Sequence, residues 1–167
     1  AAGERGRLME SIVRSWDRKD RRRFTVEGGR TDSNTREKLA ILKDHGVGRS
    51  YINPQSMNQK ALDLSGRRHT VEQVETVFSM AREMGFDNIN MDLSAWLPGE
   101  NAAYMADTLS QIEAMRPDSL TVHSLAIKRA AKFGQEGRTM DLHSEISQMV
   151  DAAAKSAGDF PRTLPYF

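Results

Sequence analysis

The stretch from Asn88 to Glu100 places a strand with two different faces directly before a tight turn and a helix start. Apolar residues alternate with polar ones along this strand, so the two sets point to opposite faces of a sheet. The apolar set is Ile89, Met91 and Leu93, and the polar set is Asn90, Asp92 and Ser94. A parallel strand flanked by helices normally buries both faces in apolar contacts. The polar face therefore predicts a lumen or cleft that receives a ligand.

Helix and strand patterns alternate along the whole chain. Strands are predicted at 23–27, ended by a turn at Gly28-Gly29, and at 49–53, 88–94 and 119–125. Helices are predicted at 4–17, from 33–35 to Gly46, from a capping box of Thr70 and Gln73 to Gly85, from Asn101 to Pro117, and at 146–154; residues 58–64 are predicted to be irregular. Such alternation is typical of βα units on a parallel sheet. The sequence predicts one α/β domain over 1–167, a four-stranded parallel sheet flanked by helices.

Composition excludes several classes of protein. The chain has no cysteine, which excludes disulfides, thiolate catalysis and any iron–sulfur cluster held by its own thiolates. No apolar run reaches membrane-spanning length and the first residues lack a signal-peptide pattern, so no membrane partner and a cytoplasmic location are expected. The net charge is +1, and the basic run Arg18–Arg23 is interpreted as a solvated helix end rather than a phosphate site. No nucleic-acid partner is expected.

The polar face of the central strand continues on its neighbours. Residues that fall in step with Asn90 and Asp92 are Thr25, Glu27, Tyr51, Asn53, Gln55, Thr121 and His123. In α/β proteins ligands bind beyond the carboxyl ends of the strands, where such residues converge. The pattern predicts a binding site at that end of the sheet.

Each of these residues also has a structural interpretation. Glu27 and Asp92 are also suited to cap helices or to pair with arginines at 30, 67 or 68. His123 is interpreted as a hydrogen-bonded interior histidine in preference to a ligand or base. The other histidines, at 45, 69 and 143, have no metal-ligand spacing with neighbouring acids. No catalytic residue and no metal site are predicted.

Several motifs in order resemble the oxygen-independent coproporphyrinogen III dehydrogenase family of radical S-adenosylmethionine (SAM) enzymes, which acts in porphyrin and heme biosynthesis. The motifs are Glu27-Gly28-Gly29-Arg30, Ile52 to Asn58, Gly66 to Thr70, Gly85 to Leu93, Leu97 to Glu100 and Asp118 to Leu125. The resemblance covers most of residues 24–133. It implies that the chain is the later part of a partial β/α barrel and that SAM is its cofactor.

The resemblance also implies roles for four residues. Glu27 and Gln55 resemble residues that contact the ribose and amino acid parts of SAM, Arg67 resembles the one that meets the SAM carboxylate, and Asp92 resembles the ribose-contacting acid. Arginine suits a carboxylate because its planar donors bind it bidentately. Acids and amides suit ribose hydroxyls because they accept hydrogen bonds.

The sequence departs from this family in two ways. The three-cysteine loop that holds the [4Fe-4S] cluster is missing, so the chain alone is not expected to cleave SAM. Tyr51 and Trp96 stand where the family has serine and glycine, and both enlarge a side chain on the lumen side.

Three hypotheses follow. The first is a cluster-less fragment of a coproporphyrinogen dehydrogenase-like enzyme that is inactive alone and partnered by a cluster-bearing half. The second is a truncated or redesigned non-catalytic scaffold whose lumen Tyr51 and Trp96 fill, with a homodimer formed through open sheet edges as a variant. The third is an independent enzyme with acid–base chemistry at Glu27, Asp92 and His123.

Overall fold

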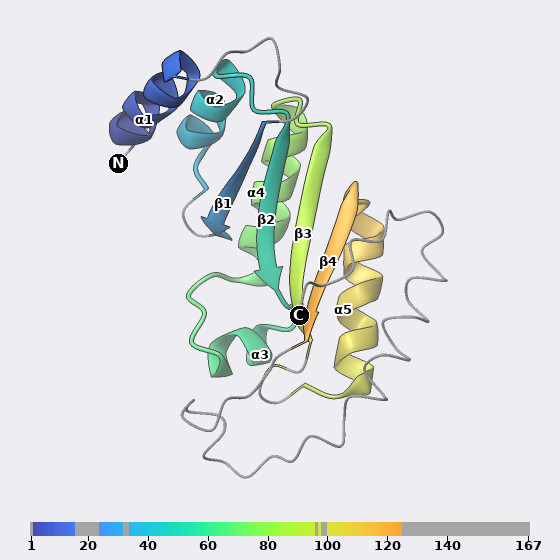
Figure 1. The fold of residues 1–167 in the computed structure, drawn as a ribbon. Coiled ribbons are helices and arrows are strands. Elements are labelled where there is room, and N and C mark those ends of the chain that lie inside the picture. The colour runs from blue at the N-terminus through green and yellow to red at the C-terminus, as the bar shows by residue number, and fades with distance from the viewer. Residues whose placement is uncertain (1, 16–23, 32–33, 96, 98–99, 125–167) are drawn as a thin grey trace.

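The computed structural model describes residues 2–15, 24–31, 34–95, 97 and 100–124 (Figure 1). The elements are α1 (Ala2–Ser15), β1 (Thr25–Arg30), α2 (Arg36–Asp44), β2 (Arg49–Gln55), α3 (Gln59–Leu64), α4 (Val71–Glu83), β3 (Asn88–Ala95), α5 (Ala102–Met115) and β4 (Ser119–Ser124). The predictions for Trp96 and for the helix at 146–154 lie outside the described residues. None of the helices in the described part is long and apolar enough to cross a membrane.

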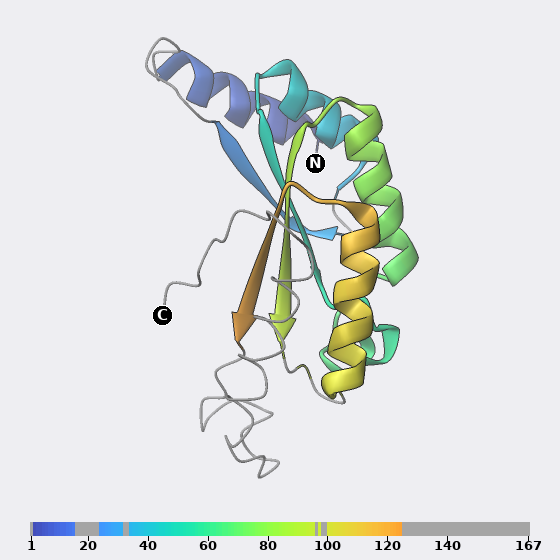
Figure 2. The ribbon, with the colours of Figure 1, turned by 90° about the vertical axis from the view of Figure 1, so that its right-hand side faces the viewer.

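The four strands form one parallel sheet in the order β1-β2-β3-β4. Neighbours in sequence are therefore neighbours in the sheet, as expected for successive βα units. Helices α4 and α5 lie on the same side of this sheet (Figure 2), and α3 lies near the carboxyl ends of β2 and β3 (Figure 1). The predicted fold class, a four-stranded parallel α/β sheet flanked by helices, is confirmed.

The apolar face of the sheet packs against the helices. On it, Ile52, Ile89, Met91 and Leu93 are each at most 1% exposed and belong to one core cluster. Helix residues complete this cluster, among them Val74 and Phe78 of α4 and Ile112 of α5. Burial of each such side chain contributes about 1.5–3 kcal/mol. The apolar set predicted from the alternation thus forms the core.

Local signals place the helix ends. The capping box of Thr70 and Gln73 opens α4 with both reciprocal hydrogen bonds. Asn101 caps α5 through a 3.0 Å bond from the backbone N–H of Tyr104. Gly85 follows α4 with φ of 80°, a left-handed conformation that costs glycine little. The capping box, the left-handed glycine and a helix start near Asn101 were predicted and are confirmed, whereas the cap by the Asn101 side chain was not predicted.

The predicted ends of the first two strands are wrong. β1 does not end in a turn at Gly28-Gly29 but continues to Arg30. Its register with β2 shifts, because Glu27 pairs with Tyr51 and Arg30 pairs with Asn53. One extra residue is thereby absorbed in β1, and glycines are well suited to such a bulge. β2 likewise runs through Pro54 to Gln55, with its own register shift against β3.

The prediction of an irregular segment at 58–64 is also wrong. Residues Gln59–Leu64 form α3, which Asn58 caps by accepting a 3.1 Å hydrogen bond from the backbone N–H of Ala61. Within this helix, Ala61 and Leu62 are buried. Six residues are too few for a helical periodicity to be recognised in a sequence.

Candidate functional site

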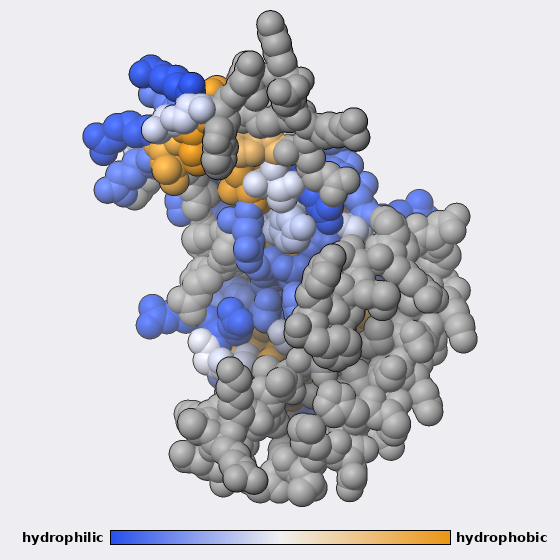
Figure 3. Space-filling view, in the orientation of Figure 1, coloured by the Kyte–Doolittle hydropathy of each residue, from blue (hydrophilic) through white to orange (hydrophobic). Residues whose placement is uncertain are grey.

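The polar side chains predicted to share a face do so. In β2, residues on the helix side are buried, whereas Arg49, Tyr51, Asn53 and Gln55 alternate with them and are half-buried. Strand register aligns Glu27 with Tyr51, Tyr51 with Asn90, and Asp92 with Thr121. Figure 3 shows hydrophilic side chains on this side of the sheet. The face opposite α4 and α5 is therefore polar, and we call it the polar face.

Gln55 and Arg67 meet near the carboxyl end of β2. Arg67 Nη2 donates a 3.1 Å hydrogen bond to Gln55 Oε1, and Ser94 Oγ donates to the same oxygen at 2.6 Å. Gln55 itself has φ of 67°, an uncommon conformation for a residue with a Cβ. Arg67 lies just beyond α3 and is half-buried. Helix α3, which the sequence did not predict, therefore connects Gln55 to Arg67, the arginine that contacts Gln55.

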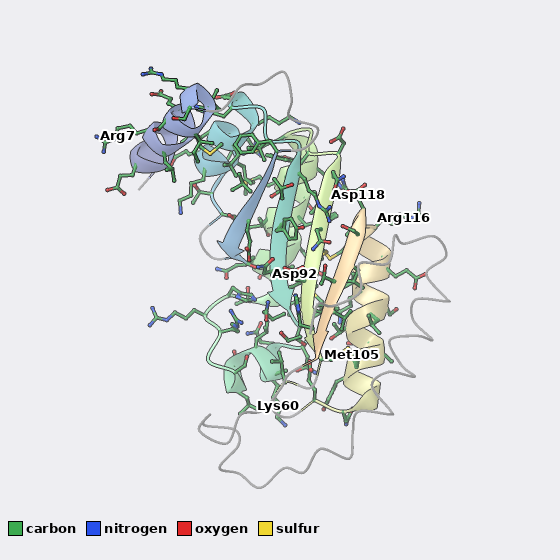
Figure 4. All side chains as sticks on the ribbon, in the orientation of Figure 1. Arg7, Lys60, Asp92, Met105, Arg116 and Asp118 are labelled. Carbon is green, nitrogen blue, oxygen red and sulfur yellow. The ribbon has the colours of Figure 1, made fainter. Side chains whose placement is uncertain are left out.

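Asp92 lies in β3, between β2 and β4 (Figure 4). Its side chain is buried at 8% exposure, and its Oδ1 accepts a 2.6 Å hydrogen bond from Asn90 Nδ2. Burial is the main influence on the carboxyl and raises its pKa. A charge on His123 and hydrogen bonds from Thr121 and Asn90 oppose this increase in pKa, while the charge of Glu27 adds to it. Asp92 is a buried acceptor held in a polar network.

Glu27 is exposed on β1, and its Oε1 accepts a 3.3 Å hydrogen bond from Asn53 Nδ2. The four predicted residues thus form two groups, with Gln55 bonded to Arg67 and Glu27 close enough to Asp92 for their charges to interact. Among side chains that the structure describes, no ion pair joins Glu27 or Asp92 to an arginine. The interpretation of these acids as partners of Arg67 or Arg68 is therefore not supported by the geometry.

The interior interpretation of His123 is wrong, because this side chain is exposed near the end of β4. Among the histidines that the structure describes, the buried one is His69, at 3% exposure, and its Nε2 lies 3.0 Å from the backbone oxygen of Pro54. His69 therefore fixes the loop that carries Arg67 against the end of β2. The described residues contain no cluster of acids and histidines able to hold a metal ion.

Two contacts were missed by the sequence interpretation. Arg49 enters the polar face from the start of β2 and bonds to Asn90 and Ser119. Its place in the alternation, two residues before Tyr51, was the available signal. Glu100 accepts hydrogen bonds from Ser56 Oγ and from the backbone N–H of Leu97, and so ties the turn after β3 to the end of β2. No local pattern indicates that contact.

The donors and acceptors on the polar face fit SAM. Arg67 has no carboxylate partner among the described side chains, and the buried Asn53 Oδ1 has no hydrogen-bond partner in that same part of the chain. A ligand with a carboxylate and hydroxyl groups would satisfy such groups. These residues cannot hold the [4Fe-4S] cluster of the family, because the 167 residues include no cysteine.

Comparison with known proteins identifies the family to which this parallel β/α sheet belongs. Residues 5–112 match the radical SAM superfamily. The chain superposes on coproporphyrinogen III oxidase (HemN) from Escherichia coli with a TM-score of 0.82 at 22% identity, covering 95% of this chain and 38% of that one. The chain therefore belongs to the radical SAM superfamily.

Comparison with curated relatives shows to which group within the radical SAM superfamily the chain belongs. The chain is 42% identical over 155 residues to the oxygen-independent coproporphyrinogen-III oxidase-like protein HemZ of Bacillus subtilis, covering 91% of this chain and 31% of that protein. It is 34% identical over 110 residues to the heme chaperone HemW of the same organism, covering 66% and 29%. It is thus a coproporphyrinogen oxidase-like member that spans about a third of the length of these relatives.

Proposed function

We propose that this chain is the SAM-contacting later part of a coproporphyrinogen III dehydrogenase-like oxidoreductase of porphyrin biosynthesis, acting in the cytoplasm. The observation that carries the proposal is the placement of Glu27, Gln55, Arg67 and Asp92 on or beside one polar face. The names of the HemZ and HemN relatives support the substrate class. The activity belongs to the complete protein, of which this chain is about a third by the length of its relatives.

Each residue has a role that its environment allows. Arg67 would bind the SAM carboxylate through guanidinium N–H groups other than the one given to Gln55. Gln55 would offer its amide N–H groups, because its carbonyl oxygen already accepts two bonds. Asp92 and Glu27 would accept hydrogen bonds from ribose hydroxyls. When bound beside a reduced cluster, SAM supplies the radical chemistry that defines the superfamily.

The cluster would have to come from polypeptide outside these 167 residues, because thiolates hold such clusters. We propose a cluster-bearing half as the partner of this chain. Supplied as a separate polypeptide under reducing, anaerobic conditions, that half should restore SAM cleavage when mixed with this chain. Absence of cleavage with a reconstituted cluster would count against such complementation.

Calorimetry on the purified chain tests the binding site. SAM should bind saturably, and Arg67→Ala should weaken it at least about tenfold, because a charged hydrogen-bonding pair is worth about 1.5–3 kcal/mol. The same variant should leave binding of 5′-methylthioadenosine unchanged, because that ligand lacks the amino acid carboxylate. Arg68→Ala is the matched control, since Arg68 is the exposed neighbour. If the unaltered chain binds no SAM, the proposed function is wrong.

The second candidate function is a non-catalytic scaffold. It is favoured by Tyr51, whose half-buried ring lies on the polar face with the Arg49 guanidinium 5.1 Å from the ring centroid. A filled lumen would exclude SAM. In this proposal the chain also self-associates, because β1 and β4 are the outer strands of the described sheet and open edges tend to pair. Sedimentation velocity showing only monomer at high concentration would remove the homodimer.

A further inference from the structure

A hydrogen-bonded relay crosses three strands on the polar face. Arg49 of β2 donates from Nη2 to Asn90 Oδ1 at 3.2 Å and to Ser119 Oγ at 2.9 Å. Ser119 and Thr121 of β4 reach the same Asn90 oxygen at 2.6 and 3.3 Å. On its other end, Asn90 Nδ2 donates to Asp92 Oδ1 at 2.6 Å. Asn90 therefore connects Arg49 to one of the predicted SAM residues.

The Arg49 guanidinium and the Asp92 carboxylate, at the two ends of this relay, fix the orientation of the Asn90 amide between them. A guanidinium only donates hydrogen bonds, and an ionised carboxylate only accepts them. The hydroxyls of Ser119 and Thr121 can do either, so they adapt to whichever way the Asn90 amide turns. Only one amide orientation satisfies both Arg49 and Asp92, with the oxygen toward the arginine and the N–H group toward the carboxylate.

Because Asn90 is buried, the opposite orientation of its amide would be costly. Asn90 is 0% exposed, so water cannot replace a lost partner, and an unsatisfied buried amide is costly. Among the described side chains, charged or titratable groups face the pair from the other three strands: Glu27 of β1, Arg49 and Tyr51 of β2, and His123 of β4. The charge of Glu27 acts against an ionised Asp92, so the N–H group from Asn90 helps to keep the carboxylate in its accepting form.

We propose that Arg49 and Asn90 are positioning residues of the SAM site: the donor-only arginine orients the Asn90 amide, which holds the Asp92 carboxylate ready to accept a ribose hydroxyl. This inference rests on the proposed function, because it assumes that Asp92 meets the ribose. Neither residue needs to touch SAM.

Four variants of the full chain test the relay by SAM calorimetry. Asn90→Ala and Arg49→Met should each weaken SAM binding several-fold, up to about tenfold. Arg49→Lys, which keeps a donor-only group, should bind within about threefold of the unaltered chain. The double variant Arg49→Met, Asn90→Ala should bind SAM no more weakly than Asn90→Ala alone, because both changes break the same relay. Asn88→Ala is the matched control on the same strand, and its side-chain oxygen has no described partner.

A second measurement separates positioning from general damage. The pKa of Asp92, followed by carbon-13 NMR of its carboxyl, should rise in Asn90→Ala and Arg49→Met and stay unchanged in Arg49→Lys and Asn88→Ala. A SAM analogue without ribose hydroxyls should lose its sensitivity to Asn90→Ala and keep its sensitivity to Arg67→Ala. Additive losses in the double variant, or an Asp92 pKa that does not respond, would overturn the relay. A chain that binds no SAM but shows this pKa pattern would sink the proposed function and leave the relay standing.

Discussion

Arg67 Nη2 donates a 3.1 Å hydrogen bond to Gln55 Oε1 and so joins the end of β2 to the loop after α3. The two residues are twelve positions apart, with a whole helix between them. The backbone of Gln55 has φ of 67°, and this conformation sets the direction of its side-chain amide. The position of Arg67 therefore depends on an unusual backbone conformation and on a short, capped helix.

The backbone of Gln55 can be tested by comparing two truncations. Gln55→Gly and Gln55→Ala both remove the oxygen that accepts from Arg67 and Ser94. Only glycine adopts positive φ without steric cost, so the glycine variant should be more stable than the alanine variant by about 1 kcal/mol. Urea unfolding measures this difference in free energy. Equal stability would mean that φ at this position is not positive in solution.

The cap of α3 should matter for both stability and binding. Asn58→Ala removes the hydrogen bond to the Ala61 N–H and should cost about 1 kcal/mol of unfolding free energy. Because α3 leads to Arg67, the same change should also weaken SAM binding. Thr35→Ala, which uncaps α2, is the control. It should lower stability by a similar amount, without changing SAM affinity. Unchanged SAM affinity in Asn58→Ala would separate α3 from the site.

Glu100 gives the fold a pH dependence. Burial is the main influence on its carboxyl and raises its pKa above the ordinary value of 4.5, despite the hydrogen bonds from Ser56 and Leu97. The folded state therefore holds the proton more tightly than the unfolded chain does. The resulting contribution to stability is present below about pH 4.5 and is lost as pH rises through the higher pKa of the folded state.

Glu100→Gln should remove this contribution. The difference in unfolding free energy between the variant and the unaltered chain should shift in favour of the variant as pH rises above 4.5. Urea unfolding at several pH values measures it. Glu83→Gln is the control, because Glu83 pairs with Arg36 in a largely exposed ion pair, with side chains 65% and 64% exposed. A pH-independent difference for Glu100→Gln would show that its carboxyl is not buried as described.

Tyr51 distinguishes the SAM site from the filled scaffold. Its ring is half-buried and lies near the Arg49 guanidinium, an interaction worth about 0.5–1 kcal/mol at exposed sites. If the polar face binds SAM, Tyr51→Ser should cost no more than about 1 kcal/mol of unfolding free energy, and Tyr51→Phe should cost less. Thermal and urea unfolding measure both. A loss of about 1.5–3 kcal/mol, the cost of exposing a buried core side chain, would favour the scaffold.

Local patterns predicted most of the fold because they act within one element. The alternation of Ile89 and Met91 with Asn90 and Asp92 follows from the strand repeat, and the capping box of Thr70 and Gln73 closes within a single turn. The same alternation predicted the polar face. The roles of Glu27, Gln55, Arg67 and Asp92 in SAM binding remain predictions.

Errors occurred where strands or distant segments meet. The bulge in β1 depends on pairing between Glu27 and Tyr51 and between Arg30 and Asn53, which no single strand encodes. The exposure of His123 likewise depends on what packs around the end of β4. α3 was missed because a helix of six residues is stabilised by its cap and by the burial of Leu62, more than by its own periodicity.

The sequence by itself determined the order of the strands and of the described helices other than α3, the two faces of the sheet and the absence of cluster-holding cysteines. These properties follow from side-chain chemistry and from repeats of two or about 3.6 residues. The tertiary structure decided that Arg49 reaches Asn90 and Ser119, 41 and 70 positions away. It also decided that Arg67 meets Gln55. Contacts of this kind depend on strand register and on the path of the connecting loops, so they exist only once the sheet has assembled.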